Sequence, residues 1–272
     1  MPRSLIIIPA RLASTRLPGK LLLDIAGKSM LQHCWERAMR AGVGDVYIAT
    51  EDSKIEQAAS AFGASVLRTG AHISGTARIA AAIEQLDLQD NDLIINLQGD
   101  EPLLPVALIR ALHAYATENL DVKLAEKLDN HFGNHSVAAC SVCSPLHDSS
   151  QLHDPGQVKV VLDYAQRALL FSRAALPWVA GAAAGQAAAT LISEQAVYLH
   201  HGLYAYTAAT LRRWHQLKPG KLEQLESLEQ LRLLENGLAI SMLVSALDHA
   251  ELVRLRGVDT AADLQRVRSL LS

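Results

Sequence analysis

The sequence lacks the features that would place it in a membrane, outside the cell or on a nucleic acid. No apolar run approaches the ~18 residues of a membrane span, and the N-terminal stretch MPRSLIIIPAR is too short and too charged for a signal peptide. The net charge is only −3, which argues against a general nucleic-acid or membrane-surface binder. We therefore expect a cytoplasmic protein with no nucleic-acid or membrane partner.

Cysteine is also scarce, with three in 272 residues, Cys34, Cys140 and Cys143. This odd, small number indicates a reduced compartment. Cys140 and Cys143 form a CxxC motif, but a zinc site would need two further ligands and a redox pair would normally open a helix. Because the motif lies in the apolar, strand-like run VAACSVCSP, we interpret both residues as buried strand thiols.

The first hundred residues alternate regularly between strand and helix patterns. Strand-like runs occupy 4–10, 45–50, 65–69 and 91–100, and helical patterns occupy 29–42, 53–63 and 75–86. In the second helix we expect Ser53 to be the N-cap and Gly63 to be the stop. This alternation predicts an α/β fold, a Rossmann-like, mixed but mostly parallel sheet flanked by helices, with ligands at the carboxyl ends of its strands.

The second half is less regular. Strand patterns cover 138–146, 157–163, 200–207 and 239–247, and helical patterns cover 221–237 and 260–271. The polar segment 119–136 is expected to be an exposed insertion, and the Ala-rich segment 179–197 either a helix with loose ends or a partly disordered surface segment. No repeat or linker divides the chain, so we expect a single domain over residues 1–272.

The loop PARLASTRLPGK, which follows the first strand, has the composition of a polyphosphate site. Gly19 would let the backbone approach an anion, Arg11, Arg16 and Lys20 would supply charge-assisted hydrogen bonds, and Ser14 a hydroxyl. The loop matches neither the Walker A nor the GxGxxG pattern. A solvated basic turn is the alternative, and the position at a strand end favours the phosphate site.

Asp100 ends a buried strand pattern and is a natural Mg²⁺ ligand, since magnesium prefers hard oxygen donors and keeps several waters. A second carboxylate must come from elsewhere, and Asp259 in GVDTAADL is the candidate. Taken alone, Asp259 is better explained as the N-cap of the last helix, with Thr260 competing for that position.

Seven motifs together carry a resemblance to a known family. They are IIPARLASTRLPGKLL, SGTAR, NLQGDEPLL, VKVVLD…ALLFSRAALPW, HHGLYAY, LESLEQLRLLENG and GVDT, in this order over nearly the whole chain. The sequence resembles the 3-deoxy-manno-octulosonate (Kdo) cytidylyltransferases, or CMP-Kdo synthetases. The first motif is shared with CMP-sialate synthetases and other sugar nucleotidyltransferases, whereas FSRAALPW, HHGLYAY and LESLEQLR together are narrower.

The resemblance implies an enzyme that transfers CMP from CTP to the anomeric hydroxyl of Kdo and releases pyrophosphate, for lipopolysaccharide biosynthesis. Such chemistry depends on positioning and charge neutralisation rather than on a protein nucleophile. The catalytic candidates are therefore Arg16, Lys20, Asp100 and Asp259. The family is usually homodimeric, and a lobe at approximately 136–230 would bind the sugar and pair two copies.

The implied binding residues fall into three groups. The CTP-binding residues are Arg11, Ser14, Arg16, Lys20, Ser74, Gly75 and Thr76, the Mg²⁺ ligands are Asp100 and Asp259, and the matches to the family's sugar pocket are Gln98, His200, Tyr204 and Glu229. Two further residues, Arg78 and Arg173, are sugar-binding candidates by type, because a sugar acid needs a cation for its carboxylate.

For three of these sugar-site residues, the local sequence pattern also offers a structural explanation. Tyr204 and Tyr206 alternate along a strand, so we expect one side of the pair to be core. His200 and His201 are adjacent and must point to opposite faces, and the resemblance selects His200. Glu229 falls in a charged helical pattern, which is usually a solvated face.

Several departures from the family pattern leave the acceptor open. Ala77 replaces a usual acid beside Arg78, Thr207 and Lys221 replace a usual basic residue and a usual proline, the approach ALDHAELVRLR to GVDT is longer and more charged, and 119–136 is inserted. An 8-amino analogue of Kdo or a nonulosonate is therefore an alternative acceptor. A non-catalytic nucleotide-binding homologue is a third alternative, which the presence of the four catalytic candidates disfavours.

Overall fold

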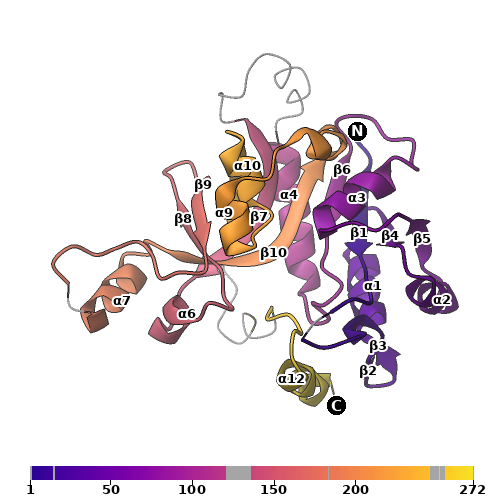
Figure 1. The fold of residues 1–272 in the computed structure, drawn as a ribbon, viewed down its shortest axis with the longest axis horizontal. Coiled ribbons are helices and arrows are strands. Elements are labelled where there is room, and N and C mark those ends of the chain that lie inside the picture. The colour runs from indigo at the N-terminus through magenta and orange to yellow at the C-terminus, as the bar shows by residue number, and fades with distance from the viewer. Residues whose placement is uncertain are drawn as a thin grey trace.

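The computed structural model describes residues 2–14, 16–120, 136–182, 184–245, 251 and 255–271. Its centre is a nine-stranded sheet with the main strand order β11-β7-β10-β6-β1-β4-β5, and β8 and β9 extend it beside β10 (Figure 1). The strands are β1 (Ser4–Pro9), β4 (Asp45–Thr50), β5 (Ser65–Arg68), β6 (Leu93–Asn96), β7 (Val137–Pro145), β8 (Lys159–Leu162), β9 (Ala168–Ser172), β10 (Tyr198–Thr207) and β11 (Ala239–Val244). Strands β2 (Asp24–Ile25) and β3 (Lys28–Ser29) form a separate small ribbon.

Within the main order of the described strands, β10 is antiparallel to both of its neighbours, β6 and β7, and the other pairs are parallel. The predicted mixed, mostly parallel sheet is therefore confirmed. Its central strands are apolar on both faces because each face is covered: Ile6 and Ile8 of β1 pack into one core, and Leu5 and Ile7 into the other.

Helices cover both faces of this sheet. They are α1 (Met30–Ala41), α2 (Ser53–Ala61), α3 (Gly75–Ile83), α4 (Val106–Asn119), α6 (Ser149–His153), α7 (Ala184–Ser193), α8 (Ala208–Arg212), α9 (Lys221–Glu226), α10 (Leu231–Glu235) and α12 (Ala261–Leu271), with 3₁₀ turns η1 (Lys20–Leu22) and η3 (Trp214–Gln216). Helices α1, α2, α4 and α12 contribute to one core, and α3, α8 and α10 to the other.

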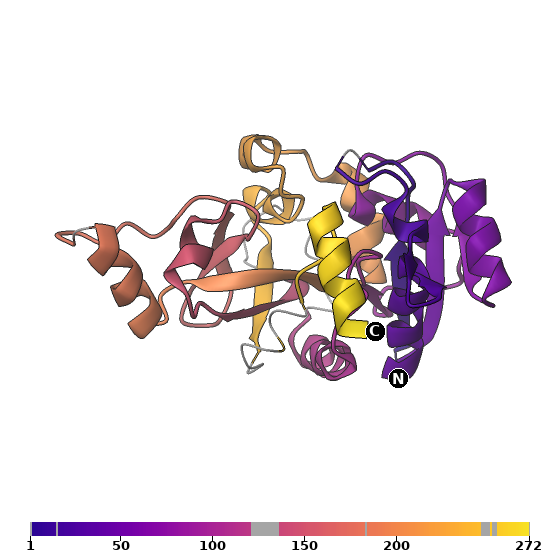
Figure 2. The same cartoon turned by 90° about the horizontal axis from the view of Figure 1, so that it is seen from below.

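One end of the molecule forms a lobe of β8, β9, α6 and α7, and β4, β5 and α2 form the opposite end (Figures 1 and 2). The lobe has a small core of its own, to which Leu152 of α6 and Leu191 of α7 contribute. Helix α7 lies inside the Ala-rich segment, so the helical interpretation of that segment is confirmed. Most of the predicted insertion at 119–136 lies outside the described residues.

The two thiols of the CxxC motif are buried, as expected, and they lie on opposite faces of β7. Cys140 packs into one core and Cys143 into the other, and both are free. Burial raises the pKa of each thiol to about 12. Among the described residues, no helix is long and apolar enough to cross a membrane.

The expectation that Ser53 caps α2 was wrong, because the neighbouring Asp52 takes that position. The Asp52 side chain accepts a hydrogen bond from the Lys54 amide at 2.9 Å. An aspartate and a serine have similar N-cap preference, so sequence alone does not separate adjacent candidates.

The single helix expected over 221–237 is two short helices, α9 and α10. The chain leaves α9 at Ser227, which has a left-handed backbone (φ 52°). The Glu235 carboxylate accepts hydrogen bonds from the amides at the start of α9 (both 2.9 Å), and Arg232 pairs with Glu223. These contacts require α10 to fold back onto α9, and they outweigh the helical propensity of the segment.

Gly44, between α1 and β4, packs closely against the backbone of β1, and this contact can be tested by substitution. A Cβ added to Gly44 would lie 1.8 Å from the carbonyl oxygen of Ser4, a backbone atom of β1. We expect Gly44→Ala to lower the free energy of unfolding by about 1–3 kcal/mol, as overpacking generally does. Urea denaturation would measure it. Gly70→Ala, where a Cβ meets nothing within 4 Å, is the control, and equal stability of both variants would contradict the packing.

Candidate active site

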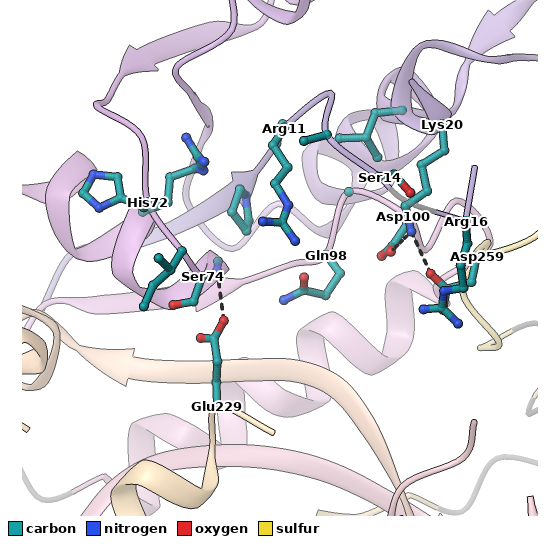
Figure 3. A pocket seen from close by; sticks show the side chains of 18 residues that line it. Arg11, Ser14, Arg16, Lys20, His72, Ser74, Gln98, Asp100, Glu229 and Asp259 are labelled. Atoms are coloured by element: carbon teal, nitrogen blue, oxygen red, sulfur yellow. Dashed lines mark hydrogen bonds and ion pairs between the residues drawn. The ribbon is translucent and has the colours of Figure 1, made fainter. Parts of the chain in front are cut away.

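A cavity of about 640 Å³ lies at the carboxyl ends of β1 and β6, where a mostly parallel sheet is expected to bind ligands (Figure 3). It is lined by residues from three segments, 9–21, 72–78 and 98–100, together with Glu229 and Asp259. Segments that are far apart in sequence therefore meet at one edge of the sheet.

The predicted phosphate loop forms one wall of this cavity. Gly19 has a left-handed backbone (φ 67°) and its amide bonds to the Leu12 carbonyl at 3.3 Å, so the loop folds back on itself before the 3₁₀ turn η1. Arg11, Ser14 and Arg16 line the cavity, as does Lys20. All four residues that the sequence assigned to the triphosphate are thus brought together.

Asp100 and Asp259 converge on one ammonium group (Figure 3). Lys20 Nζ lies 2.6 Å from Asp100 Oδ2 and 2.9 Å from Asp259 Oδ1, and it also donates to the Val258 carbonyl at 2.9 Å. Arg16 Nη2 lies 2.9 Å from the other Asp259 oxygen. The Val258 amide donates to the Asp100 carbonyl at 2.9 Å, so backbone as well as side chains join the two acidic loops.

Electrostatics hold Lys20 in its charged form. Burial acts to lower the pKa of Lys20, but the charges of and hydrogen bonds to Asp100 and Asp259 outweigh it, so this pKa lies above its usual value. The Lys20 side chain is only 13 % exposed, and the two carboxylates compensate for the loss of water around its charge.

Asp259 is not the N-cap of α12. The interpretation of Asp259 as a helix cap, which we favoured when the residue was considered alone, was wrong. Thr260 takes this position: its hydroxyl accepts from the Asp263 amide at 3.2 Å and donates to the Asp263 carboxylate at 2.8 Å. Asp263 also accepts from the amides of Asp259 and Thr260. This reciprocal bonding leaves the Asp259 side chain directed to Arg16 and Lys20.

Glu229 lies between α9 and α10 and binds the N-terminus of α3, so it does not belong to a solvated helix face. Its two carboxylate oxygens accept from the amides of Gly75 (3.0 Å) and Thr76 (3.2 Å). Ser74 caps α3 through its side chain, which accepts from the Ala77 amide at 3.2 Å. The carboxylate thus lies where a helix N-terminus favours negative charge.

A second cavity of about 210 Å³ adjoins the first, and Gly75, Gln98 and Glu229 line both. Tyr204 and Tyr206 of β10 both face it, although we expected one side of this pair to be core. Residues two apart in a strand share a face, so both rings are buried and both line the cavity. Thr76 and Asn96 lie on its walls as well.

The two histidines of β10 point to opposite faces, as expected. His200 Nε2 is hydrogen-bonded to Ser141 Oγ (3.1 Å), and His201 Nε2 to Ser144 Oγ (2.8 Å). The His200 ring lies 5.4 Å from the Tyr204 ring, so it supports the second cavity from behind rather than lining it. Burial lowers the pKa of His200, with a contribution from His201, to about 3, and burial lowers the pKa of His201 to about 4.

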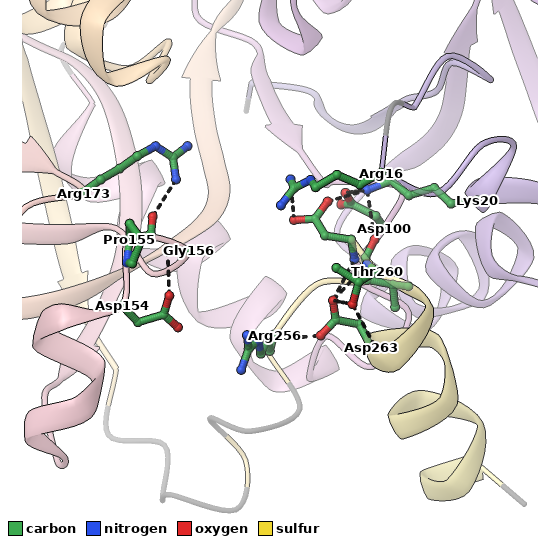
Figure 4. Close-up of polar contacts among 12 residues, drawn as sticks. Arg16, Lys20, Asp100, Asp154, Pro155, Gly156, Arg173, Arg256, Thr260 and Asp263 are labelled. Atoms are coloured by element: carbon green, nitrogen blue, oxygen red, sulfur yellow. Dashed lines mark hydrogen bonds and ion pairs between the residues drawn. The ribbon is translucent and has the colours of Figure 1, made fainter.

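The two arginines chosen by type have different environments. Arg78 is 2 % exposed, lines the first cavity, donates to Thr69 Oγ1 at 3.0 Å and forms an ion pair with Glu51. Burial, and then the charge of Arg11, lower the pKa of Arg78. Arg173 instead donates to the backbone carbonyls of Pro155 and of Glu226 at the end of α9, lines neither of the two cavities, and lies apart from Lys20 in Figure 4.

Two acidic residues near the site, Glu51 and Glu101, were not predicted from the sequence. Glu51 directly follows β4, the same strand-end position that singled out Asp100. Glu101 is a buried carboxyl group packed near Gly202 and Gly257, and burial, together with the charge of Asp100, raises its pKa to about 8. Strand-end position could have identified Glu51, whereas the burial of Glu101 has no sequence signal.

The fold and the site together define a class. A cation-lined loop after one parallel strand faces carboxylates after the next, at the edge where α/β proteins bind nucleotides. A second polar cavity shares a wall with the first. The protein is therefore of the nucleotide-binding α/β class, with room for a second substrate beside the nucleotide.

Comparison with known proteins places the chain within this class. A family model described as cytidylyltransferase matches residues 5–240. The 3-deoxy-manno-octulosonate cytidylyltransferase of Nitrosococcus oceani is 44 % identical over 98 % of this chain and 95 % of its own, and that of Idiomarina loihiensis is 41 % identical over 97 % of both. A solved structure of CMP:2-keto-3-deoxy-manno-octonic acid synthetase complexed with CTP is 37 % identical, covers 98 % of both chains and has a TM-score of 0.77. The chain belongs to the family of 3-deoxy-manno-octulosonate cytidylyltransferases.

The buried histidines predict a pH dependence of stability. A histidine whose pKa is lower in the folded than in the unfolded chain, where it is about 6.5, binds fewer protons when folded, so acid favours unfolding. We expect the free energy of unfolding to fall between pH 7 and 5, with His200 and His201 together contributing about 2 kcal/mol after allowance for partial exposure.

Urea denaturation at a series of pH values would measure this loss. The double variant His200→Asn/His201→Asn should have a shallower slope than the wild type, and His153→Asn, at an exposed position, should keep the wild-type slope. Identical slopes for the wild type and the double variant would contradict the assignment.

Proposed function

We propose that this protein transfers CMP from CTP to the anomeric hydroxyl of Kdo and releases pyrophosphate, in lipopolysaccharide biosynthesis. One observation carries the proposal: a cavity with a cationic loop and two convergent carboxylates shares a wall with a second, polar cavity. Family membership, and a relative solved in complex with CTP, support the same nucleotide.

The first cavity suits the triphosphate and the second suits the sugar acid. Arg11, Arg16 and Lys20 neutralise the charge that moves onto the pyrophosphate as it leaves. The shared wall of Gln98 and Glu229 brings the acceptor hydroxyl beside the α-phosphorus for an in-line attack. No protein nucleophile is needed, because the hydroxyl attacks directly.

Asp100 and Asp259 would hold Mg²⁺. Both carboxylates already contact one cation, the Lys20 ammonium, so they are close enough to share an ion. The described residues contain no cluster of three or more acidic, His or Cys side chains suited to a metal, which fits an ion that completes its shell with water and substrate oxygens. When bound, the ion would neutralise phosphate charge and lower the pKa of the attacking hydroxyl.

The acceptor is Kdo in this proposal, and the 8-amino analogue is the alternative. Ala77 removes an acid beside Arg78, which suggested an altered acceptor site. Glu51 lies in an ion pair with Arg78 and restores a carboxylate there, which favours the ordinary acceptor. Pyrophosphate release from CTP and Mg²⁺ with Kdo, 8-amino-Kdo and a sialate in turn is the test. A preference for the amino sugar would replace Kdo, and no release with any acid would favour a non-catalytic homologue.

Loss of one acidic ligand should abolish most of the activity. We expect Asp100→Asn to lower kcat by at least about 100-fold, comparable to the loss of other groups that stabilise a charged transition state. Pyrophosphate release at saturating CTP and Kdo would measure it. Asp87→Asn, an isosteric change at an exposed position, is the control. A kcat within about threefold of wild type for Asp100→Asn would refute the assignment.

We also propose that two copies pair through the lobe, as the resemblance implies. Large apolar side chains are exposed there, Leu169 (62 %) on β9 and Trp178 (89 %) just beyond it, with Tyr164 between β8 and β9. A second copy would remove them from water. The cytoplasmic location remains a prediction from the sequence.

Light scattering after size exclusion tests the pairing. The wild type should have twice the 29.4 kDa mass of one chain, and Leu169→Glu should shift it to a monomer, because it would bury an unpaired charge at the interface. Leu270→Glu, on the exposed face of α12, should remain a dimer. A monomeric wild type would refute the proposal.

A further inference from the structure

We propose that Lys20 occupies the metal position between Asp100 and Asp259 until a nucleotide draws it away, so that the divalent ion and CTP bind in a coupled manner. This inference rests on the proposed function, in which the two aspartates hold Mg²⁺ and Lys20 binds the triphosphate. Lys20 would then have a second role: before the nucleotide binds, its ammonium neutralises the two aspartates in place of the metal ion.

The geometry carries this inference. The Lys20 ammonium has three donors, and all three are used, by Asp100 Oδ2 (2.6 Å), Asp259 Oδ1 (2.9 Å) and the Val258 carbonyl (2.9 Å). Magnesium binds oxygen at about 2.1 Å. An ion at the ammonium position would therefore need each carboxylate oxygen to move by less than about 1 Å.

The ammonium and the metal cannot share this position. The divalent ion and the Lys20 ammonium would together place a charge of +3 against the −2 of the two carboxylates. The Lys20 side chain is only 13 % exposed, so water would screen this repulsion poorly. Lys20 must leave before the ion makes direct bonds to both aspartates. Within the described part of the chain, these two aspartates are the carboxylates that the Lys20 ammonium contacts.

A triphosphate provides that partner. Lys20 lines the first cavity beside Arg11 and Ser14, so its ammonium can exchange carboxylate for phosphate oxygens without leaving the site. The vacated aspartates are then available to a divalent ion that also binds the phosphates. Each ligand consequently favours the other, and the coupling is reciprocal by linkage. The aspartates are kept from binding divalent ions firmly while no substrate is present.

Binding of Mn²⁺ alone, measured by electron paramagnetic resonance without nucleotide or acceptor, tests the inference. Lys20→Met removes the ammonium and keeps an unbranched side chain. We expect this variant to bind Mn²⁺ at least about tenfold more tightly than the wild type, a typical size for coupling between sites. An unchanged or weaker affinity would overturn the inference.

Arg16→Met is the matched control. It removes the same charge and one contact with Asp259, but the guanidinium is 64 % exposed and bonds the outer oxygen of that carboxylate. We expect its Mn²⁺ affinity to rise by less than about threefold, because exposed charges interact weakly. Equal gains in both variants would show that net charge rather than occupancy matters, and would overturn the inference.

A measurement on the wild type covers the case in which Lys20→Met does not fold. Acylation of Lys20 by an amine-reactive ester, followed by mass spectrometry, should be faster at saturating Mn²⁺ because the ammonium has been displaced. An acylation rate that Mn²⁺ leaves unchanged would overturn the inference. These experiments involve no turnover, so their failure is distinguishable from a failure of the proposed reaction, which pyrophosphate release reports.

Discussion

The ion-pair cluster around Lys20 is the constraint on which the site depends. It joins three segments that are distant in sequence: the turn after the phosphate loop, the end of the loop after β6, and the approach to α12. The parallel pairing of β1 with β6 places the first two side by side. The third segment is attached by the hydrogen bond from the Val258 amide to the Asp100 carbonyl. The site therefore combines residues that follow the first strand with residues that precede α12.

A second constraint comes from the antiparallel strand β10. It lies directly against β6, so that Tyr204 is in register with Asn96 and its ring faces the space beside Gln98. Glu229 closes this space from the other side by binding the N-terminus of α3. The carboxylate satisfies two amides that would otherwise attract an anion, which leaves the cationic loop as the place for phosphate in the proposed reaction.

Sequence patterns predicted most of the fold and the first cavity, because both depend on local rules. Apolar runs that end in polar residues become buried parallel strands, and their carboxyl ends must meet at one edge, which brought the phosphate loop and Asp100 together. The errors arose where tertiary contacts decide. The break at Ser227 depends on Glu235 reaching back to α9, and the freedom of Asp259 depends on Asp263 completing the cap with Thr260. Neither pairing leaves a periodic trace in the sequence.

The environment of Arg78 shows why a departure from a family pattern is weak evidence until the structure is considered. Ala77 suggested a missing acid, and hence an altered acceptor, because neighbours in sequence were compared. In space the nearest acid is Glu51, from the end of β4, and the ion pair leaves the guanidinium with a balanced charge. In the proposed reaction, selection of the acceptor depends on groups that line the second cavity, Gln98, Tyr204 and Glu229. The charge balance beside Arg78 can therefore be preserved by a residue that is distant in sequence, so Ala77 is not by itself a sign of a different acceptor.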